Sequence, residues 1–168
     1  MIAYKFLREG RVAPFSLVTW PDPGEWLEAE TVDPCRTGVH ACRISQLPYW
    51  LRPELWQVEL DGEIVESELM VVAPRGRLLR RVEAWNEDTR REFGQGCVAE
   101  ARRRVERSPE LEAFALDVEQ TASSAPAFAA FATARLAELQ DGLAGYDAER
   151  GRQAQWLAAA LTFRDYPS

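Results

Sequence analysis

Lysine and histidine are scarce in this sequence, with one residue of each, Lys5 and His40. The 27 acidic side chains outnumber the 20 lysines and arginines, which leaves a net charge of −7. Proteins that bind DNA or RNA rely on clustered cations that displace counterions from the phosphates. We therefore expect no nucleic-acid partner for this chain.

Long apolar runs are missing as well. No stretch approaches the roughly 18 apolar residues that a membrane-spanning helix needs. The apolar opening of residues 1–6 is too short for a secretory signal and lacks a basic lead-in. We therefore expect a cytoplasmic protein that does not enter the membrane. Its three cysteines are then expected to be free thiols, because the cytosol keeps thiols reduced.

The common signatures of catalysis and cofactor binding are absent too. The chain has no phosphate-binding glycine loop with its lysine, no Gly-x-Ser-x-Gly elbow and no His-Glu-x-x-His pair. The sequence thus predicts no particular cofactor, and it leaves the question of enzymatic activity open.

The two halves of the sequence have different residue patterns, which together predict an α+β fold. Residues 1–84 read as short strands separated by turns, and residues 85–168 read as helices. We expect a small, mostly antiparallel N-terminal sheet packed against a C-terminal bundle of about four helices, together forming one compact unit. The expected strands cover residues 1–7, 15–20, 38–42, 56–60, 63–65, 69–73 and 77–83, with a hairpin turn at 61–62 and a short helical turn over 46–51 capped by Ser45.

The helical half is divided by clear start and stop signals. Asn86 is typical of a helix N-cap, and Ser108-Pro109 is typical of the start of a second helix. A third helix is expected over residues 126–140, and a fourth over about 147–163. The spacing of the apolar residues indicates that Phe114, Phe128 and Phe131 face inward.

Residues 35–42, Cys-Arg-Thr-Gly-Val-His-Ala-Cys, form the segment richest in reactive side chains. We call it the Cys/His segment. It contains the only histidine and two of the three cysteines. Histidine changes its charge near neutral pH, and thiolates are strong nucleophiles and soft metal ligands. A strand over 38–42 would place His40 and Cys42 on one face, with Cys35 able to fold back toward them.

Three interpretations of the Cys/His segment stay open. Cys35, His40 and Cys42 are zinc-type ligands, but the spacing is unusual and a fourth ligand is not supplied locally, with Cys97 the remaining cysteine. Alternatively, His40 carries a proton or donates a hydrogen bond within a pocket. In the third interpretation the histidine and both cysteines are ordinary core residues.

The spacing Cys35-x-x-Gly38-x-His40-x-Cys42, followed by Tyr49-Trp50 and by the stretch Val-Glu-Leu-Asp-Gly-Glu at 58–63, resembles a motif in bacterial and phage domains of unknown function. The resemblance covers roughly residues 1–85. It implies that the Cys/His segment matters, and it implies no particular reaction.

A second resemblance concerns the strand that carries His40. A Gly-x-His strand leading into a short helix is similar to the strand that supports the nicotinamide pocket in ADP-ribosyltransferase folds. Those enzymes also need a glutamate on a later strand, for which Glu66, Glu68 and Glu83 are available.

These observations together favour a small-ligand pocket centred on His40. His40 and Cys42 are the candidate catalytic residues, and Cys35, Tyr49, Trp50 and Trp56 are the candidate ligand-binding residues. The aromatic members are included because tryptophan is unusually frequent, with 6 in the chain, and aromatic rings commonly line pockets. The alternative is a non-catalytic module that binds a protein partner through its helices.

Overall fold

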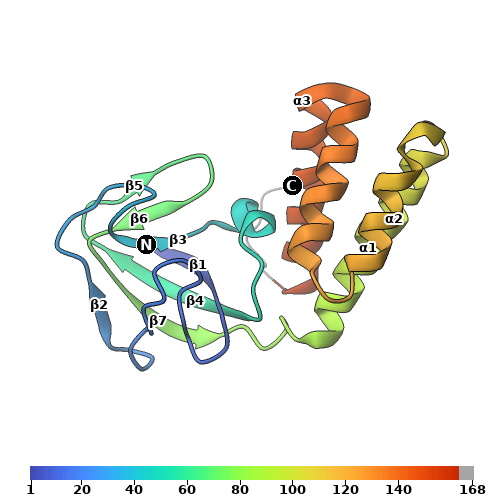
Figure 1. The fold of residues 1–168 in the computed structure, drawn as a ribbon. Coiled ribbons are helices and arrows are strands. Elements are labelled where there is room, and N and C mark those ends of the chain that lie inside the picture. The colour runs from blue at the N-terminus through green and yellow to red at the C-terminus, as the bar shows by residue number, and fades with distance from the viewer. Residues whose placement is uncertain (163–168) are drawn as a thin grey trace. The chain divides into compact units, whose positions relative to one another are not determined.

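A computed structural model describes residues 1–162 of the chain (Figure 1). Two compact units make up the fold, the first formed by Met1–Trp85 and the second beginning at Asn86. The first contains the strands and the second the long helices, so the predicted α+β class is confirmed. Each unit is described separately below.

The first unit contains two antiparallel sheets (Figure 1). The larger has the strand order β1-β4-β7-β2, and the smaller has the order β3-β6-β5. A bridge between Tyr4 and Cys42 joins β1 to the end of β3. The strands are β1 (Ile2–Leu7), β2 (Trp26–Glu28), β3 (Val39–Ala41), β4 (Glu54–Asp61), β5 (Val65–Glu66), β6 (Val71–Ala73) and β7 (Arg75–Arg81).

Side-chain alternation along these strands builds one hydrophobic core. Ala3 and Leu7 of β1 share a face and enter the core, as do the alternate residues Trp56, Val58 and Leu60 of β4. Lys5 lies between Ala3 and Leu7 in this alternation and stands opposite Trp56 in the β1–β4 register. A lysine therefore occupies a position on β1 whose neighbours on the same face are buried and apolar.

The predicted hairpin at residues 61–62 is wrong. Strand β4 pairs with β1 on one side and with β7 on the other, whereas β5 pairs with β6 in the smaller sheet. The physical reason is length, because β1 and β7 each offer β4 six paired residues and β5 is only two residues long. Gly62 still makes a turn, at φ 93°.

The predicted strand over residues 15–20 is also wrong. Leu17 adopts φ 59°, and its N–H bonds to the carbonyl of Ala13, so the segment turns instead of extending. As a result Phe15 is 73% exposed. The short strand β2 follows this loop and has no counterpart in the prediction.

A 3-10 helix, η1 (Ile44–Tyr49), lies where a short helical turn is expected. Its cap is Arg43 rather than Ser45: the Gln46 side chain accepts a bond from the Arg43 N–H at 2.8 Å. Gln46 also donates to the carbonyls of Ser67 and Glu68, both at 3.0 Å, which fastens η1 to the connection between β5 and β6.

The second unit is built from α1 (Glu87–Val105), the short 3-10 helix η2 (Pro109–Leu111), α2 (Glu112–Thr121) and α3 (Pro126–Ala160), with α1, α2 and α3 in mutual contact (Figure 1). Asn86 caps α1 as predicted, accepting from the Thr89 N–H at 3.1 Å. Gly142, at φ 69° and ψ −162°, breaks α3 into two helical segments where the third helix is predicted to end. The fourth predicted helix corresponds to the later segment, and residue 163 lies outside the described residues.

The interior of the second unit is lined by alanines, not by the phenylalanines that were expected there. Ala129, Ala130 and Ala134 are completely buried, whereas Phe128 and Phe131 are 46% and 48% exposed. Phe114 of α2 is likewise half exposed. At these positions of α3 the small side chains let the helices approach closely, whereas Phe93 of α1 is a buried ring of this unit, 3% exposed and packed against Trp156. No helix within residues 1–162 combines the length and the hydrophobicity needed to cross a membrane.

Candidate functional site

A cavity of about 510 Å³ lies in the first unit, and its lining residues all belong to that unit. A volume of this size is within the range of small-molecule sites. Its wall combines aromatic and aliphatic side chains with cationic ones, and none of the described residues that line it is an aspartate or glutamate. The residues used below are Lys5, Phe15, Cys35, Arg36, His40, Cys42 and Trp50.

Four of the six residues singled out from the sequence line this cavity, namely Cys35, His40, Cys42 and Trp50. The other two do not. Trp56 is 9% exposed within the core, and its indole N–H donates to the Glu54 carboxylate at 3.0 Å. Tyr49 ends η1 and is not among the lining residues. The ligand-binding role predicted for these two residues therefore has no support in the geometry.

The turn before β3 presents Cys35 at the cavity. Paired backbone bonds between Asp33 and Thr37 close the turn, at 2.9 Å in each direction. Cys35 is exposed at its tip with φ 69°, a conformation that non-glycine residues rarely adopt. Gly38 then leads into β3 at φ 116°, and a Cβ there would lie 2.4 Å from Val72 Cγ1, so only glycine fits.

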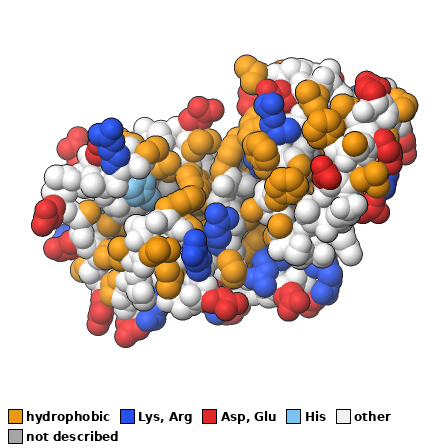
Figure 2. Space-filling view, viewed as in Figure 1, with side chains coloured by type: hydrophobic (Ala, Val, Ile, Leu, Met, Phe, Trp, Pro, Cys, Tyr) orange, Lys and Arg blue, Asp and Glu red, His pale blue; other side chains and the backbone are white. Residues whose placement is uncertain are grey.

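His40 has its two ring nitrogens in different situations. Nδ1 donates to the Gly38 carbonyl at 2.9 Å, since a carbonyl can only accept. The neutral ring therefore carries its lone pair on Nε2, which is buried and has no hydrogen-bond partner among the described residues. Burial lowers the pKa of His40, and the Lys5 charge lowers it further against the raising effect of the Gly38 bond. Part of the imidazole still reaches the surface, as the pale blue side chain in Figure 2.

Cys42 is placed in a way that suppresses thiolate chemistry. Its side chain is buried, and its thiol donates to the Tyr4 carbonyl at 3.3 Å. Burial raises the pKa of Cys42 to about 12, although the Lys5 charge acts in the opposite direction. A thiol with this pKa is almost entirely protonated at neutral pH. The catalytic role predicted for Cys42 is therefore unsupported, and we assign it none.

Two aromatic rings stand at the cavity wall. The indole N–H of Trp50 donates to the Leu69 carbonyl at 2.7 Å, which fixes the orientation of the ring. Phe15 meets Trp50 edge to face, with 6.1 Å between the ring centroids. The guanidinium of Arg52 lies over the Phe15 ring, 5.9 Å from its centroid. Because Phe15 is largely exposed, these contacts hold an apolar ring at the border between cavity and solvent.

Lys5 is the functional candidate that the sequence reasoning did not select. It lines the cavity described above and also a neighbouring cavity of about 370 Å³, and His40 lines both as well. Burial lowers the pKa of Lys5 from 10.5 to about 8. The signal available in the sequence was the single lysine in the alternation Ala3-Lys5-Leu7, where an apolar residue is the expected choice.

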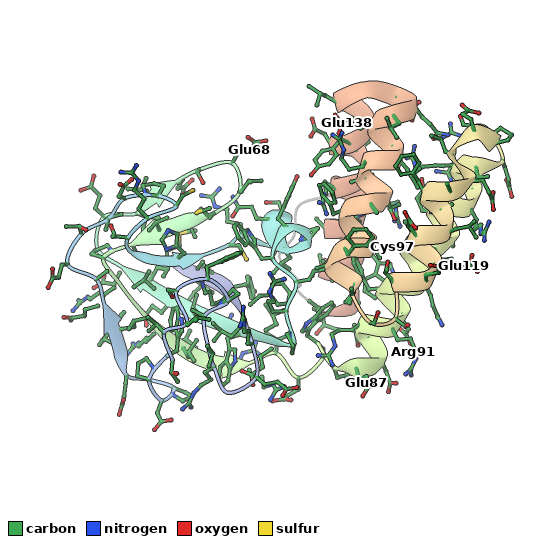
Figure 3. The ribbon with its side chains drawn as sticks, in the orientation of Figure 1. Glu68, Glu87, Arg91, Cys97, Glu119 and Glu138 are labelled. Carbon is green, nitrogen blue, oxygen red and sulfur yellow. The ribbon has the colours of Figure 1, made fainter. Side chains whose placement is uncertain are left out.

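The residues do not assemble a metal site. Within residues 1–162 no group of three or more histidine, cysteine, aspartate or glutamate side chains could hold a metal ion. Cys97, the remaining cysteine, is buried on α1 in the second unit (Figure 3), and burial raises the pKa of its thiol to about 12. The zinc interpretation of the Cys/His segment thus gains no support from the geometry.

Comparison with protein-family models, with curated proteins and with solved structures found no match. The resemblance of the Cys/His segment to bacterial and phage domains therefore stays a prediction, as does its similarity to ADP-ribosyltransferase folds. The function must be argued from the cavity itself.

Proposed function

We propose that the first unit binds a small organic molecule in the cavity beside His40, and that His40 carries a proton to or from it. The observation that carries this proposal is the buried Nε2 of His40, which has no hydrogen-bond partner within residues 1–162. A buried polar atom without a partner costs about 1–3 kcal/mol. Such a cost is commonly tolerated at a position where a ligand or water completes the bond.

The orientation of the imidazole supports a proton-accepting role. Since Nδ1 donates to the Gly38 carbonyl, the free nitrogen of the neutral ring is Nε2. The lowered pKa of His40 keeps the ring neutral at pH 7. His40 therefore takes up a proton first and returns it afterwards, as a general base does.

The cavity wall supports a particular class of ligand. Phe15 and Trp50 offer apolar ring surface, which favours a ligand with an aromatic or aliphatic body. Lys5 and Arg36 supply positive charge; Asp33 pairs with Arg36 at 3.8 Å from outside the cavity, and the described lining residues include no carboxylate. We therefore propose a ligand whose polar end is neutral or anionic rather than cationic.

Nuclear magnetic resonance provides a direct test, because one histidine gives one imidazole C2–H resonance. Benzoate and benzylamine are matched in size and opposite in charge. We expect benzoate to shift the His40 resonance saturably and benzylamine to bind more weakly or not at all. If no apolar-bodied probe of either charge moves this resonance, the proposal is wrong.

A pair of variants controls for folding. Phe15 and Leu143 are both 73% exposed, but only Phe15 lines the cavity. We expect Phe15→Ala to weaken benzoate binding several-fold and Leu143→Ala to leave it unchanged, with neither variant losing stability measurably. Equal effects of the two variants would contradict binding at this cavity.

We also propose a cytoplasmic location, supported by the fact that Cys35, Cys42 and Cys97 are all unpaired.

A second candidate function is protein binding by the helical unit. Its apolar side chains Phe128, Phe131, Leu139 and Leu143 are between 46% and 73% exposed along α3, and Figure 2 shows hydrophobic side chains at the surface of this unit. Exposed aromatic rings of this kind are typical of interaction surfaces. Sedimentation velocity of the wild type and of the double variant Phe128→Ser, Phe131→Ser tests self-association. A larger sedimenting species that grows with protein concentration and is lost in the variant supports this candidate. A wild-type protein that stays monomeric shows that the helical unit does not bind a second copy of itself.

A further inference from the structure

Lys5 has an unusual environment for a lysine. Strand alternation places it on the face of β1 that carries Ala3 and Leu7, both members of the hydrophobic core. Lysines normally extend their ammonium groups into water and are rarely placed among buried apolar residues. Here the residue lines the two neighbouring cavities that also share His40. Lys5 is half-buried, and it borders the site.

The ammonium group of Lys5 also lacks a partner. The ion pairs of the first unit are made by arginines, for example Arg75 with Asp61 and Arg77 with Glu59. The backbone of Lys5 is paired with that of Trp56, but its ammonium group makes no hydrogen bond or ion pair with any residue from 1 to 162. The nearby Cys42 thiol offers no negative charge at neutral pH, because it is buried and donates its own proton to the Tyr4 carbonyl. A structural role as an ion-pair partner is thus excluded for the described part of the chain.

We propose that Lys5 is a nucleophilic amine that forms a reversible imine with an aldehyde or ketone bound in the cavity. This inference rests on the proposed function, since it names the reactive group of the ligand whose body lies against Phe15 and Trp50. A lysine with a desolvated amine in an apolar pocket is the usual arrangement for this chemistry. The lowered pKa of about 8 is in accord with it, because part of the amine is then uncharged near neutral pH.

The reaction balances with the groups present. The lone pair of Lys5 Nζ adds to the carbonyl carbon, a C–N bond forms, and the electrons of the C=O π bond move to oxygen. The nitrogen then loses a proton, the oxygen gains one, and the product is a carbinolamine. Departure of the hydroxyl group as water, with a second proton, leaves the C=N bond. No oxidant or reductant is needed, and hydrolysis reverses the sequence.

His40 is suited to move the proton in these steps. Its Nε2 holds the free lone pair of the neutral ring, and the residue lines the same two cavities as Lys5. It takes up each of the two protons that leave Nζ and delivers each to the former carbonyl oxygen, first to complete the carbinolamine hydroxyl and then to release that hydroxyl as water. The Lys5 charge, which adds to the effect of burial in lowering the pKa of His40, is absent from the neutral amine that reacts, so the imidazole is more basic beside the reactive form of Lys5.

The experiment uses benzaldehyde with sodium cyanoborohydride, which reduces an imine to a stable secondary amine. Each adduct adds the mass of benzaldehyde less one oxygen atom, and peptide mapping locates it. In the protein as assayed, the α-amine at Met1 serves as an internal reference. Near pH 7.5 about a quarter of an amine of pKa about 8 is uncharged, against about one in a thousand at 10.5. Even after allowing for the lower nucleophilicity of a weaker base, we expect trapping at Lys5 to be at least tenfold faster in the folded protein than in urea.

Two variants define the result. Lys5→Arg keeps the positive charge but cannot form an imine, and it should abolish the adduct at position 5 while leaving labelling of Met1 unchanged. His40→Gln keeps a hydrogen-bonding side chain but cannot carry a proton, and it should slow trapping at Lys5 several-fold without changing the final extent. Melting curves of both variants confirm that they are folded.

The outcomes separate this inference from the proposed function. If benzaldehyde shifts the His40 resonance and yet only Met1 is trapped, the cavity binds ligands and the imine proposal is wrong. Trapping at Lys5 at equal rates in folded and urea-unfolded protein would also overturn it, since the fold would then contribute nothing. If benzaldehyde and benzoate both leave the resonance unmoved, the proposed function fails first.

Discussion

Replacing Lys5 by methionine is expected to stabilise the protein at neutral pH. The two side chains have similar length and volume, so the change removes the charge and little else. Burial lowers the pKa of Lys5 from 10.5 to about 8, and each pKa unit corresponds to about 1.36 kcal/mol. The folded state therefore pays at most about 3 kcal/mol to hold the protonated lysine, and Lys5→Met removes that cost.

The pH dependence identifies the cause. Below about pH 8 the lysine is protonated in both folded and unfolded chains, so the full cost is present. Between about 8 and 10.5 the folded protein has released a proton that the unfolded chain still binds, so this contribution to stability rises with pH. We expect the advantage of Lys5→Met over the wild type to shrink by about 2 kcal/mol between about pH 7 and about pH 9.5.

Urea unfolding of both proteins at the two pH values measures this difference, and comparison of the two cancels the titration of groups that they share. The same variant has a second readout, because removing the Lys5 charge should raise the pKa of His40, followed through its single C2–H resonance. An advantage that is the same at both pH values, together with an unchanged His40 titration, would show that the ammonium is solvated and that our placement of Lys5 is wrong.

Two further predictions concern the turn before β3 and the thiols. Gly38→Ala should destabilise the protein by at least about 2 kcal/mol, since residue 38 has φ 116° and the new Cβ would lie 2.4 Å from a valine methyl group. Gly96→Ala, with open space around its Cβ, should stabilise α1 by about 0.5–1 kcal/mol. Thermal unfolding of each variant measures the two effects. With Ellman's reagent only the exposed Cys35 should react promptly in the folded protein, and the buried Cys42 and Cys97 only in urea; three fast thiols in the folded state would contradict the burial.

Much of the fold could be predicted because its signals are local. The change from strand texture to helix texture near residue 85, the Asn86 cap and the helix break at Gly142 depend on a few neighbouring residues. Strand pairing is different, because it is decided by partners far apart in the sequence. The Asp61-Gly62 signal predicts a hairpin, but β4 gains more paired residues from β1 and β7 than β5 can offer.

The prediction of which helix face is buried was wrong for a related reason. Phe128 and Phe131 have the spacing of an inward stripe, yet the adjacent alanines Ala129 and Ala130 face the interior. A periodic pattern locates an apolar face but does not determine which of two apolar faces is buried. That choice depends on how closely the neighbouring helices approach.

The candidate site was partly accessible from the sequence. The concentration of reactive residues in the Cys/His segment pointed to His40, Cys35 and Cys42, which do line one cavity. The position of Lys5 at the cavity was hidden, since most lysines are solvated. Only the pairing of β1 with both β4 and the end of β3 places it beside His40.

Pro74 is the only residue between β6 and β7, so a single residue connects the two sheets at this point. Strand β3, which carries His40, is hydrogen-bonded to β6. Because β6 is joined to β7 by one residue, we expect β3 to move only together with the larger sheet. Entry of a ligand is therefore expected through the surface loop that holds Phe15, while the wall behind it keeps its shape. A wall held in this way would select ligands by their shape.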